Sequence, residues 1–102
     1  MNIVCIPAYN EESYIANIVK SAKNHVDQVI VCDDGSSDNT AKLAREAGTI
    51  VITHDKNQGY GAAISTLFDD ALKQTVEWYL QNKSWWYDTC NSQIISCNMV
   101  LF

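Results

Sequence analysis

Two adjacent carboxylates end an apolar run in this 102-residue chain, in the stretch VIVCDDGSSDNT at residues 29–40. Asp33 and Asp34 are followed by glycine, serine, asparagine and threonine, which is typical of a turn. A carboxylate at the end of a buried strand can also accept a hydrogen bond from a nucleobase imide or a ribose hydroxyl. The same residues therefore allow two interpretations: a turn with a helix cap, or a nucleoside-binding site.

Three further segments carry polar or glycine-rich chemistry close to predicted strand ends. The segment PAYN at residues 7–10 follows the first apolar run, and the pair HD at residues 54–55 follows the third. Gly59 and Gly61 lie in a polar loop, where a glycine backbone can come close to a diphosphate. The two glycines do not form the dinucleotide-binding pattern, because Ile64 stands where that pattern needs glycine or alanine.

The elements that must position these segments alternate between strands and helices. Apolar runs at residues 3–7, 29–32 and 50–53 are predicted to be strands. Two helical stripes lie between them, and a third helix follows the glycine-containing loop. Strands that are continuously apolar are typical of a parallel sheet with both faces covered. The sequence therefore predicts an α/β protein with a Rossmann-like parallel half-sheet.

The helices are predicted from capping residues and from apolar spacing. Asn10 is expected to cap the first helix, with the negative charges of Glu11 and Glu12 in its first turn. Ser36 or Ser37 is expected to cap the second helix. The third helix has one long apolar stripe that is predicted to be buried. The stripe consists of Ile64, Leu67, Phe68, Ala71, Leu72, Val76, Tyr79 and Leu80.

All four polar segments are predicted to meet at one edge of the sheet. The carboxyl ends of parallel strands share an edge, and ligands of such sheets bind there. Because neighbouring strand residues point to opposite faces, we expect one of Asp33 and Asp34 to face the crevice and the other to hold the turn. Tyr9 is placed to offer its ring against a base. His54 has no evident nucleophile to serve and is predicted to be an ordinary loop residue.

Composition limits the partners. The formal net charge is −5, which argues against binding to the backbone of a nucleic acid but allows one small phosphorylated ligand. No basic leader precedes the first apolar run, and no apolar stretch approaches the roughly 20 residues of a membrane helix. The four cysteines show neither a zinc-binding nor a redox spacing. A cytoplasmic location is therefore expected.

The segments IVCIPAYNEE, VIVCDDGSSDNT and HDKNQGYGAAI together resemble the N-terminal half of a family 2 glycosyltransferase. The most similar branch holds the dolichol-phosphate mannose synthases and polyprenyl-phosphate glycosyltransferases. The resemblance implies a GT-A type fold that binds a UDP- or GDP-linked sugar with Mg²⁺ or Mn²⁺. It also implies a lipid-phosphate or saccharide acceptor, and a cytoplasmic protein or one peripheral at the cytoplasmic face of a membrane.

The resemblance also implies which residues bind the donor. The group expected to line the nucleoside pocket or to approach the ribose is Pro7, Ala8, Tyr9 and Glu11. The base would hydrogen-bond to Asp34, with Asp33 beside it. The group expected near the ribose and the diphosphate is Gln58, Gly59 and Gly61.

The chain departs from the family pattern after the third helix. Residues 1–80 are predicted to form the nucleotide-sugar-binding part, and residues 81–102 a divergent tail with one short strand. The chain has no Asp-x-Asp motif to hold the cation and no recognisable catalytic base, and Asp88 is a single acid near the expected place. We therefore expect an incomplete fragment, and assign no catalytic or metal-binding residue.

Two other functions stay open at this point. The chain could be a non-catalytic nucleotide-binding module, or a remnant that needs a partner to complete its sheet. A receiver-like signalling domain also gathers acids at strand ends, but its acid pair follows the first strand, whereas here the pair follows the second. An exposed edge of the first strand would in addition allow two copies to associate.

Overall fold

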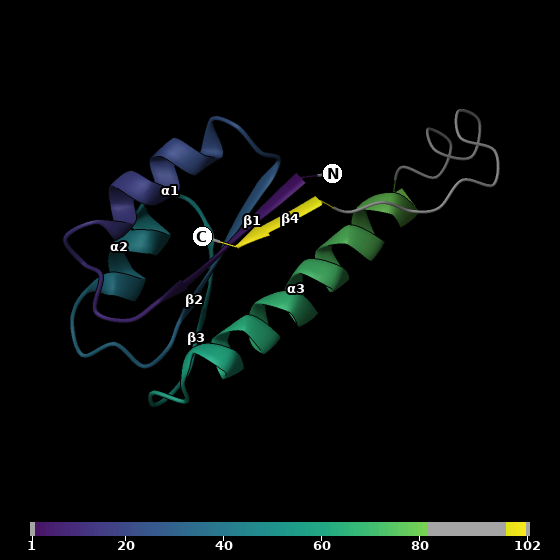
Figure 1. Cartoon of the computed structure of the whole chain (residues 1–102). Helices are drawn as coiled ribbons and strands as arrows, with labels where there is room; N and C mark the ends of the chain where they lie inside the picture. Colours follow the sequence, from purple (N-terminus) through teal and green to yellow (C-terminus); the bar gives the residue numbers. More distant parts are fainter. Residues whose placement is uncertain (1, 82–97, 102) are drawn as a thin grey trace.

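The computed structural model of this chain describes residues 2–81 and 98–101. Its four strands form one parallel sheet in the order β3-β2-β1-β4 (Figure 1). The strands are β1 (Asn2–Ala8), β2 (Gln28–Asp33), β3 (Ile50–Thr53) and β4 (Asn98–Leu101), and the helices are α1 (Ile15–Lys23), α2 (Thr40–Glu46) and α3 (Tyr60–Gln81). The predicted α/β class and the Rossmann-like parallel half-sheet are confirmed.

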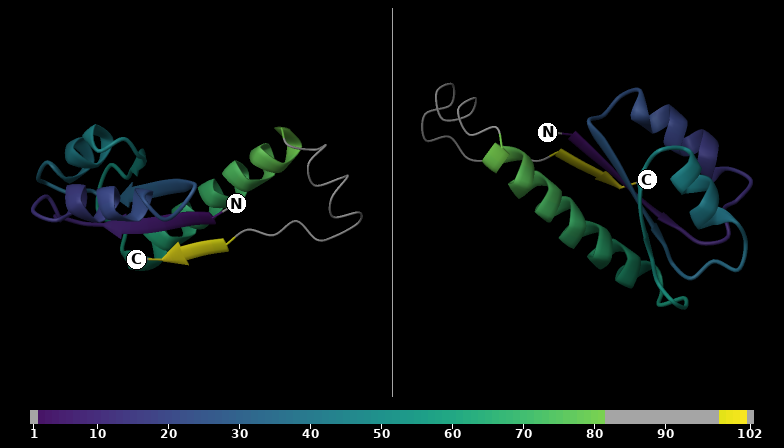
Figure 2. Two further views of the ribbon diagram at one scale, coloured as in Figure 1. Left: turned by 90° about the horizontal axis from the view of Figure 1, so that it is seen from above. Right: turned by 180° about the vertical axis from the view of Figure 1, so that it is seen from behind.

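Helices cover both faces of the sheet (Figure 2). Alternate residues of β1 point to opposite faces, so Val4 and Ile6 pack under α1 and α2. Ile3 and Cys5 point the other way, toward α3. Each fully buried aliphatic side chain of this kind contributes about 1.5–3 kcal/mol to folding. The central positions of β1 and β2 are therefore apolar on both faces of the sheet.

Strand β4 lies next to β1, in a register that runs from Asn2 opposite Asn98 to Cys5 opposite Leu101. β1 is therefore an internal strand. The predicted exposed edge of β1 is not found, because β4 occupies it, and self-association of two copies stays a prediction. Residues 82–97, which include Asp88, lie outside the described residues, so the division of the chain at residue 81 stays a prediction.

The helix α1 begins later than predicted. Its first residue is Ile15, and Asn10 lies well before it with a positive φ of 54°. Asn10 does not cap the helix: its backbone N–H donates to Ser36 Oγ at 2.8 Å, and its side-chain oxygen accepts from the Ser37 N–H at 2.9 Å. The segment after β1 is thus tied to the segment after β2.

The helix α2 also begins later than predicted. It starts at Thr40 after Asn39, so the two serines before it are not its caps. The backbone N–H of Glu11 donates to Thr40 Oγ1 at 2.9 Å, and the N–H of Asn39 donates to Glu12 Oε2 at 3.0 Å. These residues join the loops after β1 and β2 at the carboxyl edge of the sheet.

The helix α3 buries only one of the two rows of side chains that the predicted stripe contained. The buried row repeats every fourth residue and consists of Ala63, Leu67, Ala71, Thr75 and Tyr79. The prediction is right for Leu67, Ala71 and Tyr79. It is wrong for four large apolar residues that are exposed, which are Phe68, Leu72, Val76 and Leu80. Within the described residues, no helix is both long and apolar enough to cross a membrane.

Candidate functional site

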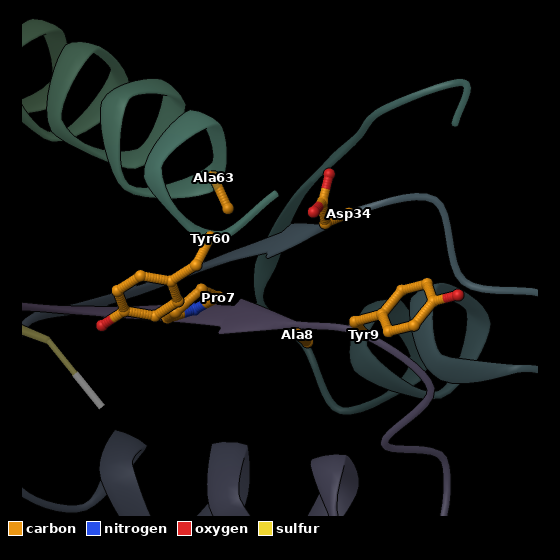
Figure 3. A pocket seen from close by; sticks show the side chains of 6 residues that line it. All are labelled: Pro7, Ala8, Tyr9, Asp34, Tyr60 and Ala63. Carbon is orange, nitrogen blue, oxygen red and sulfur yellow. The ribbon is translucent and has the colours of Figure 1, made fainter. Parts of the chain in front are cut away.

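A cavity of about 120 Å³ lies at the carboxyl edge of the sheet, where β1 ends and α3 begins (Figure 3). Its size is close to that of a single planar ring rather than of a whole nucleotide sugar. Its walls are mostly apolar, and one carboxylate reaches it. The lining residues are Pro7, Ala8, Tyr9, Asp34, Tyr60 and Ala63.

Four of these six lining residues belong to the set predicted from the sequence. The end of β1 and Asp34 are brought together because β1 and β2 are paired, with Ala8 opposite Asp33. Tyr60 and Ala63 were missed, because the sequence did not show how close the first turn of α3 comes to the end of β1. Tyr60 is exposed and Ala63 is buried, so the helix forms one wall of the cavity.

The other predicted residues do not line the cavity. The backbone N–H of Glu11 donates to Thr40, at the start of α2. Gln58 and Gly59 lie behind the carboxylate of Asp34, and Gly61 lies in the first turn of α3.

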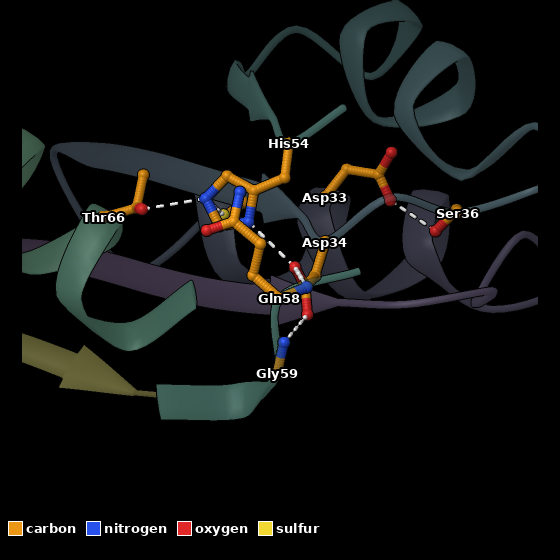
Figure 4. Close-up of polar contacts among 8 residues, drawn as sticks. Asp33, Asp34, Ser36, His54, Gln58, Gly59 and Thr66 are labelled. Carbon is orange, nitrogen blue, oxygen red and sulfur yellow. Dashed lines mark hydrogen bonds and ion pairs between the residues drawn. The ribbon is translucent and has the colours of Figure 1, made fainter. Parts of the chain in front are cut away.

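Asp34 joins the end of β2 to the loop that leads into α3 (Figure 4). Its Oδ1 accepts the backbone N–H of Gln58 at 2.9 Å, and its Oδ2 accepts the backbone N–H of Gly59 at 2.9 Å. Gly59 has a φ of +100°, which favours glycine. Only 4 % of Asp34 is exposed, and its own N–H donates to the Ala8 carbonyl at 2.8 Å. The carboxylate is therefore held within the site.

His54 is the residue whose place beside Asp34 was not predicted from the sequence. It is not an ordinary loop residue, because its ring is bonded at both nitrogens. Nδ1 lies 2.8 Å from Asp34 Oδ1, and Nε2 lies 2.9 Å from Thr66 Oγ1. In the sequence, only its position after the third predicted strand pointed to the site. Its hydrogen-bond partners could not be predicted, because Asp34 follows β2 and Thr66 belongs to α3.

Asp33 points away from the cavity and holds the turn after β2. Its Oδ1 accepts a hydrogen bond from the Ser36 hydroxyl. The same serine oxygen accepts the N–H of Asn10, so the turn is connected to the segment after β1. The two neighbouring carboxylates thus have different surroundings.

The hydrogen bonds shift the ionisation of two carboxyl groups. The N–H of Gln58, then His54 and then the N–H of Gly59 hold the pKa of Asp34 below its ordinary value of 3.8. The hydroxyl and the N–H of Thr40 hold the pKa of Asp38 below the same value.

The pKa of the Cys32 thiol is shifted in the opposite direction. Burial, with added effects of the negative charges of Asp34 and Asp33, raises the pKa of Cys32 to about 11.

The described residues do not fit a divalent cation. Among them, no group of three or more His, Cys, Asp or Glu side chains is arranged to hold a metal ion. Asp34 accepts three hydrogen bonds from N–H groups, and Asp33 accepts one from Ser36. Neither carboxylate presents a full set of free oxygens to an ion.

Curated relatives resemble this chain over most of its length. One is the UDP-N-acetylglucosamine–dolichyl-phosphate N-acetylglucosaminyltransferase of Methanococcus voltae, which is 39 % identical over an alignment of 79 residues that covers 60 % of this chain. Another is the undecaprenyl-phosphate 4-deoxy-4-formamido-L-arabinose transferase of Proteus mirabilis, which is 37 % identical over an alignment of 94 residues that covers 78 % of this chain. The matched regions span 32 % and 29 % of the lengths of these relatives.

A solved structure and a family profile agree with these relatives. Glucosyl-3-phosphoglycerate synthase from Mycobacterium tuberculosis, crystallised with Mn²⁺, UDP and glucosyl-3-phosphoglycerate, matches with a TM-score of 0.57 and 31 % identity. The match covers 63 % of this chain and 27 % of that one, and it shows a GT-A type fold. Residues 3–80 match the profile of Glycosyl transferase family 2. This chain therefore belongs to glycosyl transferase family 2.

Proposed function

We propose that this chain is the donor-binding part of a glycosyltransferase and that its cavity holds the base of a UDP- or GDP-linked sugar. The observation that carries the proposal is the cavity between Tyr9, Asp34 and Tyr60. Apolar walls suit the faces of a base, and a carboxylate suits the ring N–H that uracil and guanine both present.

The rest of the donor would extend from the cavity along the start of α3. The N-terminus of a helix carries a partial positive charge, which suits a diphosphate in a protein of net charge −5. Gly61, in that first turn, leaves open space where a side chain would otherwise stand. Glu11 and Gln58 belong to this proposal as neighbours of the ribose, and Asp33 as the residue that fixes the turn beside Asp34.

Binding of UDP and GDP to the ¹⁵N-labelled chain, followed by amide NMR with and without Mg²⁺, tests the proposal. We expect shift changes at Tyr9, Asp34 and Tyr60, and none at Gln28, the first residue of β2, or at Asp27 before it. A folded spectrum that stays unchanged with both nucleotides would contradict it.

Two tyrosines provide a matched pair for the same titration. Tyr9→Ala removes a wall of the cavity and is expected to weaken binding by about tenfold, the scale of one lost aromatic contact. Tyr14→Ala removes a tyrosine that is 64 % exposed and does not line the cavity, and should leave the affinity unchanged. Equal effects of the two changes would place the ligand elsewhere.

The acceptor and the location are also part of the proposal. Two relatives carry names that specify dolichyl phosphate and undecaprenyl phosphate as acceptors. By analogy with these names, we propose a lipid phosphate as the acceptor. Such an acceptor agrees with a cytoplasmic protein that lies at the membrane surface. Transfer of sugar to such a lipid by a longer protein that contains this chain would test them.

A non-catalytic nucleotide-binding module is the second candidate. The hydrogen bonds of Asp33 and Asp34 to protein donors favour it, because they leave each carboxylate fewer oxygen positions for a cation on the diphosphate. Nucleotide affinity that does not depend on Mg²⁺ or Mn²⁺ is the expected result for such a module. Affinity that rises with the cation would favour a glycosyltransferase site.

A further inference from the structure

A chain of hydrogen bonds connects α3 to the end of β2 through His54 (Figure 4). Thr66 Oγ1 lies 2.9 Å from His54 Nε2, and His54 Nδ1 lies 2.8 Å from Asp34 Oδ1. The side chains of His54 and Asp34 are 10 % and 6 % exposed. Protein groups rather than bulk water therefore fix both ends of the imidazole ring.

The carboxylate determines which ring nitrogen carries the proton. An ionised carboxylate only accepts hydrogen bonds, so Nδ1–H of His54 donates to Asp34. In the neutral imidazole Nε2 is then an acceptor, and two donors reach it. These are the Thr66 hydroxyl at 2.9 Å and the Cys32 thiol at 3.7 Å. The network selects the tautomer with the proton on Nδ1.

The acceptor positions of Asp34 are almost filled. A carboxylate has about four lone-pair positions. Oδ1 receives two donors, from His54 and Gln58, whereas Oδ2 receives only the N–H of Gly59. The remaining position belongs to Oδ2, on a residue that lines the cavity.

We propose that His54, oriented by Thr66, is a positioning residue that fixes the Asp34 carboxylate so that Oδ2 can accept a donor from the nucleotide base. This inference rests on the proposed function, because it takes the base as the ligand of Asp34. Gln58 and Gly59 are neighbours in one loop and can move together with the carboxylate. His54 lies at the β3 end of the same connection, directly after Thr53, and its ring is bonded to Thr66 of α3, so it adds a support from α3 that Gln58 and Gly59 do not provide.

Two pairs of variants separate this role from a general structural one. Thr66→Val removes the hydroxyl at nearly constant volume, and Thr66→Ser keeps it. His54→Phe removes both ring nitrogens, and His54→Asn keeps a donor close to the place of Nδ1. The threonine pair keeps the inference testable if His54→Phe does not fold.

The first measurement needs no ligand and reads the tautomer by ¹⁵N NMR of the imidazole. We expect the proton on Nδ1 in the wild type, in Thr66→Ser and in Thr66→Val, because Asp34 is unchanged in all three, and a changed Nε2 signal only in Thr66→Val, which loses the hydroxyl donor. The amide signals of Gln58 and Gly59 should shift in Thr66→Val and return in Thr66→Ser. A proton on Nε2 in the wild type, or unchanged signals in both Thr66→Val and His54→Phe, would overturn the inference.

The second measurement is the affinity for UDP and GDP by calorimetry. We expect His54→Phe to weaken binding about tenfold or more and Thr66→Val about threefold, with Thr66→Ser close to the wild type. His54→Asn should bind more tightly than His54→Phe. If the wild type binds a nucleotide and all four variants bind it with the same affinity, the positioning role of His54 is refuted, whereas the proposed function is not. A folded wild type that binds neither nucleotide would refute the proposed function itself.

Discussion

Gly35 lies against Asn57 so closely that no side chain fits between their backbones. A Cβ on Gly35 would stand 2.4 Å from the Asn57 nitrogen and 2.4 Å from the Lys56 carbonyl carbon. Gly35 also has a φ of +74°, which favours glycine. The turn after β2 and the loop after β3 can approach each other only with glycine at this position, and that approach brings Gln58 and Gly59 to Asp34.

Gly35→Ala is expected to lower the free energy of unfolding by roughly 2 kcal/mol or more, because strain and a backbone clash add. Gly61→Ala is the matched control, since a Cβ there meets no atom within 4 Å and the residue is helical. It should leave stability equal or raise it by up to about 1 kcal/mol. Urea unfolding measures both, and a loss in the control as large as that in Gly35→Ala would contradict this explanation.

Acid should unfold the chain partly through Asp34 and Asp38. The pKa of each is held below 3.8 in the folded state, so each stabilises the fold above that value. This stability is lost as the pH falls from about 4 through the lowered folded pKa values. The expected result is a free energy of unfolding that decreases over this range in the wild type.

Asp34→Asn and Asp38→Asn should each reduce the slope of this decrease, since an amide does not titrate. The double variant should reduce it further. Urea unfolding at a series of pH values between 2 and 5 gives the slopes. A double variant with the slope of the wild type would show that other carboxyl groups cause the acid transition.

Leu67 and Leu72 differ only in which row of α3 they occupy. Leu67 is fully buried against the sheet, whereas Leu72 is 53 % exposed. Leu67→Ala is expected to cost about 2–5 kcal/mol, because it leaves a cavity in the core. Leu72→Ala should cost less than about 1 kcal/mol. Thermal or urea unfolding compares them, and similar losses would mean that the row of Leu72 is also covered in solution.

The sequence predicted the strands well, but the stripe of α3 that it predicted to be buried spanned two rows, of which the structure buries only one. Two neighbouring rows repeat every fourth residue, and the row through Phe68 and Leu72 carries larger apolar side chains than the row through Ala63 and Ala71. Because its apolar side chains are larger, the first row was also predicted to be buried. Small residues let the helix come close to a sheet that already supplies bulk from Ile3 and Ile30, so the second row is buried.

Contacts between segments that lie far apart in the chain could not be predicted from the sequence either. Asn10 and the serines after β2 have the chemistry of helix caps, but they bind each other across 26 or 27 residues instead. β4 has no local signal for its partner, and pairs with β1 almost 100 residues away. His54 likewise gains its role only when β2, β3 and α3 are brought together.

Gly61 allows the proposed diphosphate position to be tested without a loss of stability. A methyl group at Gly61 enters open space at the first turn of α3, and the folded chain itself does not use that space. If the diphosphate lies there, Gly61→Ala should weaken binding of UDP and GDP by about tenfold while the fold stays as stable as before. Calorimetry and urea unfolding on the same sample measure the two quantities.

Ser65→Ala is the matched control for this change. Ser65 is exposed one turn further along the same row of α3, so an alanine there changes the helix in a similar way but lies away from the first turn. It should leave the affinity unchanged. Weaker binding of UDP in Ser65→Ala and Gly61→Ala alike would indicate a general effect on the helix, and the diphosphate would then have to lie elsewhere along the carboxyl edge.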